Sequence, residues 1–410
     1  MNFDLTDKQT YWRDRIRDHN ERFLRPRVAD YYAEQAVGDR WKVLQVVEEE
    51  KARAKAAGLW NLFMPPTSGR VHVDDSIHFD GPGLTNMEYA LCAEEMGRIG
   101  FASEVYNCSA PDTGNMEVFL RYGTAEQKEK WMLPLMNGEI RSAFAMTEPD
   151  VASSDATNIR TSIRRDGDSY VINGRKWFTS GANVAAFTTV FCETEPEQQR
   201  HGKFSAIIVP TNTPGYRIKR VVKTMGDTVG GHCELELDHV RVPAGNLLGE
   251  RGKGFTIAQK RLGPGRIFHC MRWLGQAQRA FELMCNYAGE RYAHGSLLSE
   301  KGEIQRYIAE SAAEIQAARL MTLDAARVMD SGDDARVQIA LIKFWGARML
   351  HNVIDRAIQV HGALGVTEDT PLEFMYREAR YARIYDGPDE VHRMTVARKL
   401  VQDPVGNAPW

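Results

Sequence analysis

Two carboxylates, Asp386 and Asp389, flank a Gly-Pro turn in the segment RIYDGPDEVH, residues 383–392. A carboxylate on such a turn can act as a general base if it reaches the proton it removes and if dry surroundings raise its pKa. Two ordinary surface carboxylates at the start of a helix would give the same sequence pattern. We expect Asp389 to be of this second kind and to cap the following helix, whose first turn contains Glu390. Asp386 is the candidate base.

Two segments in the first half of the chain could hold a ligand, although each also has an ordinary structural explanation. Residues 144–158, FAMTEPDVASSDATN, are rich in hydroxyl groups, which could bind a ligand or only cap the turns of a polar loop. Residues 174–182, GRKWFTSGA, place Trp177 and Thr179 two positions apart, so a strand would carry both on one face. There they could line a flat cofactor, or the Trp177 ring could close a small barrel.

Two further candidates lie in the second half of the chain. Arg291 is expected at the end of a helix before a glycine turn, where its guanidinium could bind a phosphate or remain solvated. Residues 359–372, QVHGALGVTEDTPL, contain glycines that would also suit a Schellman-type helix end. The segment GPGRIF, residues 263–268, is not a dinucleotide-binding fingerprint, because helix rather than strand is expected on both sides of it.

The periodicity of apolar residues changes twice along the chain and indicates how these segments are positioned. Residues 1–140 have a helical pattern, with a capping box formed by Thr124 and Gln127. Residues 141–250 contain about five short strand-like segments, and from residue 251 the period returns to that of helices. We therefore predict an α+β multidomain fold with an N-terminal α-helical domain (1–140), a central antiparallel β-barrel or sandwich (141–250) and a C-terminal four-helix bundle (251–410).

The composition is that of an ordinary globular protein, and it excludes several classes of function. Hydrophobic residues make up 43% and charged residues 26% of the 410 residues, and the net charge of −3 predicts no nucleic-acid partner and no pull toward anionic membranes. The six cysteines form no CxxC pair, which favours reduced thiols over disulfides or a metal site. Neither a targeting segment nor an apolar run of membrane-spanning length is apparent, so we expect a soluble, cytoplasmic protein without membrane insertion.

The motifs, taken in this order, resemble those of the acyl-CoA dehydrogenase family over essentially the whole chain. The flavin signature of the family corresponds to Thr147-Glu148-Pro149 followed by Ser154-Asp155. The remaining matches are Trp177-Phe178-Thr179, Arg291 to Gly295 with His294 in the aromatic place, Gln359 with Gly362 and Gly365, and Asp386-Gly387-Pro388 in place of the usual Glu-Gly-Thr. The resemblance implies the fold of that family and FAD as the cofactor.

The resemblance also implies roles for individual residues. Trp177 would pack on the flavin ring, and the Thr179 hydroxyl would meet flavin N5. Arg291 and Gln359 would reach the FAD of a neighbouring subunit, so a homodimer or a homotetramer is expected. The residues expected to bind FAD are Phe144, Met146, Thr147, Ser153, Trp177, Phe178, Thr179, Arg291, Leu298, Gln359, Gly362, Pro388 and Glu390. The residues expected to bind an acyl-CoA substrate are Ser154, Leu262, Arg266, Tyr385 and Gly387.

Three departures from the common family pattern occur together in this chain. The flavin loop reads DVASSD where GAGSD is common, Asp386 replaces Glu, and Pro388 replaces Thr. In these three features the chain resembles the branch known as acyl-CoA dehydrogenase family members ten and eleven. That branch implies metabolism of 4-hydroxyacyl-CoA after phosphorylation by a kinase, which would be a separate protein here. The wider family implies an electron-transfer flavoprotein as the electron acceptor.

The resemblance makes Asp386 the catalytic residue. In the family, this carboxylate removes the α-proton of the thioester while the β-hydrogen leaves as hydride, and the backbone N–H of the base helps to stabilise the enolate-like charge. Some members carry their Glu one residue before the position of Arg266, but Gly265 stands there in this chain. Asp is about 1.3 Å shorter than Glu, so we expect the loop or the substrate to lie closer.

Two alternatives remain open at the level of sequence. An Asp base also occurs in nitroalkane oxidase, a flavoprotein of the same fold that would act without CoA, whereas Arg266 and Ser154 favour CoA. A flavin-free, non-enzymatic scaffold is the second alternative, and the intact flavin segments oppose it.

Overall fold

The structure is a computed structural model that describes residues 4–38, 42–64, 81–199, 201–225 and 231–406. It forms two compact units, each assembled from stretches that are separate in the sequence. The helical unit comprises Met1–Pro26, Leu84–Ser103 and Arg266–Trp410, and the sheet unit comprises Arg27–Gly83 and Glu104–Gly265. In chain order the secondary structure is helical, then β, then helical, as predicted.

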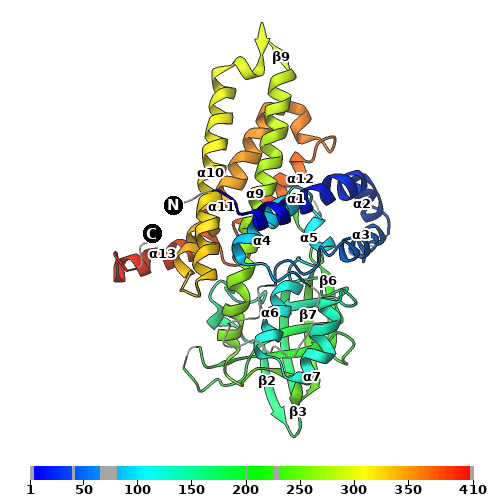
Figure 1. Cartoon of the computed structure of the whole chain (residues 1–410). Coiled ribbons are helices and arrows are strands. Elements are labelled where there is room, and N and C mark those ends of the chain that lie inside the picture. The colour runs from blue at the N-terminus through cyan, green and yellow to red at the C-terminus, as the bar shows by residue number, and fades with distance from the viewer. Residues whose placement is uncertain (1–3, 39–41, 65–80, 200, 226–230, 407–410) are drawn as a thin grey trace. The chain divides into compact units, whose positions relative to one another are not determined.

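The helical unit is built around long helices that run side by side (Figure 1). Its helices are α1 (Asp7–His19), a π-helical turn (Asn20–Leu24), α4 (Asn86–Gly97), the part of α9 (Gly254–Glu290) from Arg266 onward, α10 (Gly302–Asp330), α11 (Arg336–His361), α12 (Leu372–Ala382) and α13 (Asp389–Gln402). A two-stranded hairpin, β9 (Tyr292–Ala293) with β10 (Ser296–Leu297), joins α9 to α10, and 3-10 turns cover Leu298–Glu300 and Gly362–Val366.

Two glycines explain why α4 packs against helices that are far from it in the sequence. A Cβ atom at Gly97 would overlap the backbone of Arg272, and one at Gly275 would overlap the backbone of Glu94. The backbones of α4 and α9 therefore touch, which only glycine permits. The carboxylate of Asp330, the last residue of α10, accepts the backbone N–H of Asn86 at 2.8 Å and so satisfies a free donor at the start of α4.

The sheet unit contains one eight-stranded sheet with the order β6-β7-β3-β2-β4-β5-β8, and β1 pairs in parallel with β4. The strands are β1 (Ser142–Ala145), β2 (Ser162–Asp166), β3 (Ser169–Ser180), β4 (Phe187–Glu193), β5 (Phe204–Pro210), β6 (Tyr216–Val221), β7 (His232–Pro243) and β8 (Leu247–Leu248). The buried face of this sheet is lined by Ile172, Val190, Ile207, Cys233 and Leu235.

The predicted central β domain is confirmed, but its sheet is open and does not close into a barrel. Within the described ranges, β6 and β8 are the two end strands and no pairing joins them. β8 is only two residues long, and the middle of β6 is exposed and carries the cations Arg217, Lys219 and Arg220. Charges on an edge strand oppose further pairing. The sequence estimate of about five strands missed the short strands β1, β2 and β8.

The first part of α9, up to Gly265, belongs to the sheet unit and follows the sheet in the sequence. The other α-helical and π-helical segments of this unit lie before the sheet in the sequence (Figure 1). They are α2 (Val28–Gln35), α3 (Gln45–Ala56), α6 (Asp112–Tyr122), α7 (Ala125–Gln127), a π-helical turn (Lys128–Met132) and α8 (Leu133–Met136). The short α5 (Ala102–Val105) spans the sequence boundary between the two units, after Ser103. The capping box of Thr124 and Gln127 is confirmed, and the Gln127 amide also donates to the carbonyl of Leu247 at 2.8 Å. Across the described ranges, no helix is long and apolar enough to cross a membrane.

Candidate active site

The turn that carries Asp386 lies between α12 and α13 in the helical unit. Its backbone is unusual, because Asp386 has φ 53° and Gly387 has φ 98°, both in the left-handed region. Such a conformation is costly for a residue with a side chain and persists only where the surroundings enforce it. At Gly387 the surroundings leave no room for a side chain, since an added Cβ would lie 2.7 Å from Nε2 of His392.

Three basic side chains from three different helices hold this turn. Arg266 of α9 donates from Nε to the Asp386 carbonyl oxygen at 2.9 Å, and Nε2 of His392 lies 3.1 Å from the same oxygen. The fully buried ammonium of Lys343 in α11 donates to the carbonyl of Ala382 at 2.8 Å and to that of Gly387 at 3.3 Å. Both ends of the turn are therefore anchored to the helix bundle.

The carboxylate of Asp386 faces a histidine that the motifs had not indicated. Oδ2 of Asp386 lies 3.3 Å from Nε2 of His269 in α9. Burial by itself would raise the pKa of Asp386, but the His269 contact and the charges of Arg266 and Lys343 outweigh burial and hold this pKa below its ordinary value. The expectation of a raised pKa is therefore wrong for this structure, because the cations that anchor the turn also stabilise the carboxylate.

The backbone N–H of Asp386 has no hydrogen-bond partner in the part of the chain that the structure describes. Aromatic rings lie on one side of the turn, while the Asp386 side chain itself is 25% exposed. Trp273 donates from Nε1 to the Tyr385 hydroxyl at 3.0 Å, and the ammonium of Lys343 lies 5.2 Å from the centres of both rings. Asp386 thus combines an ionised carboxylate with a free backbone donor.

Asp389 does not cap α13 as expected. Pro388 occupies the N-cap position, and Asp389 is the first residue of the helix. The Asp389 side chain is buried, and its Oδ2 accepts from Nε of Arg383 at 2.9 Å. A buried carboxylate needs a cationic partner, so this ion pair ties the two ends of the turn together. Glu390, in contrast, is an exposed side chain 3.6 Å from Arg393.

The flavin signature folds against β3 in the sheet unit. Thr147 donates from Oγ1 to the Trp177 carbonyl at 2.6 Å and accepts the Trp177 N–H on its own carbonyl at 3.0 Å. Ser153 folds back onto the same loop, where its Oγ accepts the N–H of Glu148 at 2.9 Å. Short polar residues therefore hold the shape of the loop, which agrees with the structural explanation of their composition.

The Trp-x-Thr motif is not a regular strand, so the expectation that Trp177 and Thr179 share one face through simple alternation is wrong. The pairing of β3 with β7 shifts between Lys176 and Thr179, and Phe178 has φ 50°. This bulge buries Lys176 and Thr179, which are three positions apart, and leaves Phe178 43% exposed.

The hydroxyl of Thr179 supplies an independent sign that a ligand belongs at the bulge. Its oxygen is buried and has no hydrogen-bond partner among the described residues. Leaving such a group unpaired costs about 1–3 kcal/mol, so a native structure needs a reason to keep it. An acceptor on a bound cofactor would be that reason.

The other residues of the sheet unit that are expected to contact a ligand are half-buried or exposed. Phe144 lies beneath the guanidinium of Arg261, whose carbon is 4.0 Å from the ring centre. Phe144 and Met146 are half-buried against the small core beside the sheet, and Leu262 is half-buried on α9. Ser154 is exposed.

Comparison with known proteins agrees with this arrangement. Residues 6–139, 143–240 and 252–401 match the N-terminal, middle and C-terminal domains of acyl-CoA dehydrogenase. This chain belongs to the acyl-CoA dehydrogenase family. The family is one of oxidoreductases, and its three-part helical, sheet and helical fold is the one described above.

Individual relatives cover nearly all of this chain. "Probable acyl-CoA dehydrogenase FadE2" of Mycobacterium tuberculosis is 47% identical over 97% of this chain and 96% of its own length. Acyl-CoA dehydrogenase family member 10 of Mus musculus is 49% identical over 89% of this chain but 34% of its own length, and family member 11 of Rattus norvegicus is 46% identical over 92% and 48%. This chain therefore spans about a third to a half of those two longer relatives.

Solved structures of the family have the same fold. A candidate acyl-CoA dehydrogenase of Mycobacterium abscessus is 41% identical with a TM-score of 0.91, covering 98% of this chain and 100% of the other. The butyryl-CoA dehydrogenase of Megasphaera elsdenii is 29% identical with a TM-score of 0.83, also covering 98% and 100%.

Two family motifs lie on the far ends of the bundle helices, away from the Asp386 turn in sequence. Arg291 follows the last residue of α9, and its side chain is exposed, while its carbonyl accepts the N–H of Leu298 at 2.8 Å. Gln359 is exposed near the end of α11, and Gly362, with φ 61°, ends that helix. These residues are thus available to a ligand or to another subunit.

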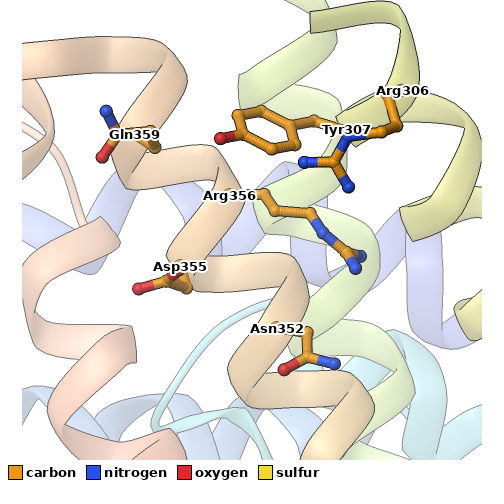
Figure 2. A pocket seen from close by; sticks show the side chains of 6 residues that line it. All are labelled: Arg306, Tyr307, Asn352, Asp355, Arg356 and Gln359. Carbon is orange, nitrogen blue, oxygen red and sulfur yellow. The ribbon is translucent and has the colours of Figure 1, made fainter. Parts of the chain in front are cut away.

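Gln359 lines a polar pocket of ≈ 360 Å³ between α10 and α11 (Figure 2). Arg306 and Tyr307 reach into it from α10, and the rest of the lining comes from one face of α11: Asn352, Asp355, Arg356 and Gln359. Motif reasoning had found only Gln359. The spacing of the α11 residues, every three or four positions, was visible in the sequence as a polar stripe and could have indicated the others.

Three neighbours of Asp386 were also missed by motif reasoning: His269, Lys343 and His392. The one available signal was Lys343 itself, a charged residue inside the apolar segment IALIKFWGARML. A lysine in a buried stripe is rare unless its amine has partners.

Proposed function

We propose that this chain is an FAD-dependent acyl-CoA dehydrogenase that converts an acyl-CoA thioester to the 2-enoyl-CoA. The observation that carries the proposal is the position of Asp386, on a turn whose backbone is locked by Arg266 and His392. Proton abstraction requires an unprotonated carboxylate in a fixed position; the lowered pKa of Asp386 keeps it unprotonated, although a raised pKa would make it a stronger base.

In the proposed reaction, Asp386 removes the α-proton and becomes a neutral acid. The electrons of the broken Cα–H bond form the new double bond to Cβ. When bound, FAD accepts the β-hydrogen with its electron pair. The free N–H of Asp386 would donate to the thioester carbonyl, where negative charge develops. In a site that excludes water, such a donor stabilises the transition state by about 3–4 kcal/mol. The proton on Asp386 then returns to solvent.

The flavin would lie against the loop that contains Thr147 and the bulge of β3. The support for this placement is the unpaired buried hydroxyl of Thr179 beside Trp177. Phe144, Met146, Ser153 and Phe178 belong to the same loop and bulge, and we propose that they contact FAD. Pro388 and Glu390 are proposed as FAD contacts from the sequence pattern.

A second copy of the chain would complete the cofactor site. Arg291, Leu298, Gln359 and Gly362 are proposed to meet the FAD held by a neighbouring subunit. The pocket beside Gln359 has a polar lining that includes Arg306 and Arg356. Both arginines are paired with glutamates, so a phosphate bound there would compete with these carboxylates. We therefore propose a homodimer or a homotetramer.

The proposed substrates are acyl-CoA esters, including 4-hydroxyacyl-CoA esters after phosphorylation by a separate kinase, and the proposed electron acceptor is an electron-transfer flavoprotein. The support for the substrate class is the resemblance to family members 10 and 11. Ser154, Leu262, Arg266, Tyr385 and Gly387 are the proposed acyl-CoA contacts.

Anaerobic titration of the purified, flavin-containing protein tests this proposal. Straight-chain acyl-CoA, 4-hydroxyacyl-CoA and 4-phosphoacyl-CoA esters are added in turn, and bleaching of the flavin absorbance is recorded. We expect at least one ester to bleach the flavin stoichiometrically without oxygen. Bleaching by a nitroalkane but by no ester would identify an oxidase instead, and a protein purified without flavin that cannot be reconstituted with FAD would indicate a scaffold.

A further inference from the structure

His269 stands between a guanidinium and the proposed catalytic carboxylate. Its Nε2 lies 3.3 Å from Oδ2 of Asp386, and its Nδ1 lies 3.1 Å from Nη2 of Arg272, one turn further along α9. The three side chains form a chain of contacts that ends on a single oxygen of Asp386. Oδ1, the other oxygen, has no such contact within the described residues.

The Arg272 contact decides which nitrogen of His269 carries the proton. A guanidinium has donors only and cannot accept a hydrogen bond, so Nδ1 of His269 must be the acceptor. The neutral imidazole then carries its proton on Nε2, the nitrogen that lies 3.3 Å from the carboxylate of Asp386. A second proton on Nδ1 would face Arg272 directly.

The surroundings of the ring oppose its protonation as well. The Tyr385 ring centre lies 4.7 Å away and the Trp273 ring stacks at 6.3 Å. Burial lowers the pKa of His269, and repulsion from Arg272 and Lys343 acts in the same direction, whereas Asp386 acts in the opposite one. Other charged or titratable groups of the described residues near the carboxylate are Arg266 and Cys270 on α9 and His392 on α13. Glu378 on α12 acts on the neighbouring Tyr385, and burial raises the pKa of Glu378 to about 7.

We propose that Arg272 and His269 form a relay that positions Asp386 for proton abstraction. The proposal rests on the proposed dehydrogenase function. His269 is a positioning residue: its Nε2–H fixes Oδ2, so the α-proton is taken by Oδ1. In that step the Cα–H bond of the substrate breaks and an O–H bond forms on Oδ1, while His269 keeps its own proton. The relay would orient a carboxylate whose side chain is shorter than the usual Glu.

A matched pair of substitutions separates positioning from simple packing. His269→Gln can place an amide N–H near the position of Nε2, whereas His269→Phe fills the space without a donor. Both proteins must retain FAD and the thermal unfolding midpoint of the wild type within a few degrees to be compared. We expect His269→Phe to slow anaerobic flavin reduction by roughly 10- to 100-fold and His269→Gln to lose much less, because a small misplacement of a reacting group is costly.

The pH profile gives a readout that packing alone would not move. The probe is 3-thiaoctanoyl-CoA, whose α-proton can be removed without oxidation and whose anion forms a charge-transfer band with bound flavin. Loss of the Nε2–H removes a group that lowers the pKa of Asp386, so the acidic limb of this titration should move to higher pH in His269→Phe and stay near the wild-type position in His269→Gln. Equal losses in both variants with unmoved limbs would overturn the proposal.

The tautomer can be measured without substrate or turnover. With ¹⁵N-labelled histidine, the signals of His269 are assigned by their loss in His269→Gln, and we expect a protonated Nε2 and an unprotonated Nδ1. In Arg272→Met the Nδ1–H form should become populated. A protonated Nδ1 in the wild type, or an unchanged tautomer in Arg272→Met, would overturn the relay. If no ester and no 3-thiaoctanoyl-CoA perturbs the wild-type flavin, the proposed function fails, and these signals still decide the tautomer.

Discussion

The ammonium of Lys176 lies 2.9 Å from Oε1 of Glu148, and both side chains are buried in the sheet unit. The same carboxylate accepts the backbone N–H of Thr161 at 2.8 Å and that of Arg160 at 2.9 Å, and Lys176 also donates to the Met146 carbonyl. The pair therefore ties the flavin loop, the start of β2 and the bulged part of β3 into one cluster.

Lys176→Met should destabilise the fold by about 3–5 kcal/mol, because it leaves the Glu148 carboxylate buried without its counter-charge. The flavin should also be lost more readily during dialysis. Urea unfolding of the two proteins measures the first effect. The double variant Lys176→Met/Glu148→Gln should regain part of the stability, since a neutral amide keeps an acceptor for the backbone donors. Equal stability of all three proteins would contradict the prediction.

Thr179→Val should leave the stability of the flavin-free protein almost unchanged, because its hydroxyl has no partner to lose among the described residues. Flavin reduction should nevertheless slow by about tenfold or more if that hydroxyl serves the flavin. Thr161→Val is the matched control, since the Thr161 hydroxyl donates to Glu148 at 2.5 Å and its loss should cost about 1.5–3 kcal/mol. Thr179→Val should therefore change stopped-flow flavin reduction but hardly change urea unfolding. Thr161→Val should change urea unfolding more than flavin reduction.

Asp386→Asn should slow flavin reduction by at least ~10²–10⁴-fold, because an amide cannot accept the proton at neutral pH. FAD content and thioester binding should survive, since neither requires the negative charge. Anaerobic mixing with the best ester from the titration panel provides the measurement. A rate close to that of the wild type would indicate that another acidic residue, and not Asp386, acts as the base.

Asp386→Glu is the complementary test of the turn geometry. Glu is the common family residue, yet the turn here is locked by Arg266, His392 and Lys343. The longer side chain should place its oxygens about one bond length away from the position that Asp386 reaches, so we expect slower reduction than in the wild type. Reduction that is as fast or faster would show that the turn adapts.

His392 should make stability depend on pH. Burial, with repulsion from Arg266 and Lys343, lowers the pKa of His392 to about 4 from its ordinary value of 6.5. Between these values the unfolded chain binds a proton that the folded chain does not, so stability falls as the pH drops from about 6.5 to about 4, by about 3 kcal/mol at most. His392→Gln keeps a donor for the Asp386 carbonyl and should show a smaller drop in thermal midpoint between pH 7 and pH 5. An identical drop in both proteins would exclude this role.

Arg291→Ala should lower both FAD occupancy and the stability of the dimer, because the proposed partner of this exposed side chain is the cofactor of a second subunit. Size-exclusion chromatography with light scattering and the ratio of flavin to protein absorbance measure the two effects together. Arg306→Ala offers a comparison, since Arg306 lines the pocket beside Gln359 but is also paired with Glu303 and Glu310. A monomer that keeps a full complement of FAD would refute the prediction.

The sequence by itself determined the features that depend on neighbouring residues. The order of helical and strand segments, the capping box at Thr124 and the family motifs around Thr147 and Trp177 are local patterns. Such patterns depend on residues that are close in the sequence, so they can be recognised without the structure. Asp386 was selected for the same reason, because its Gly-Pro turn is contiguous.

Only the tertiary structure decided how the sheet ends and what surrounds the base. Whether β6 and β8 meet depends on pairings across the whole sheet, and the bulge at Phe178 depends on the register of β3 with β7. Arg266 and Asp386 are 120 residues apart, and Lys343 and Gly387 are 44 apart, so no spacing rule brings them together. The sign of the pKa shift of Asp386 follows from those distant cations, because electrostatic interaction depends on distance in space and not on position in the chain.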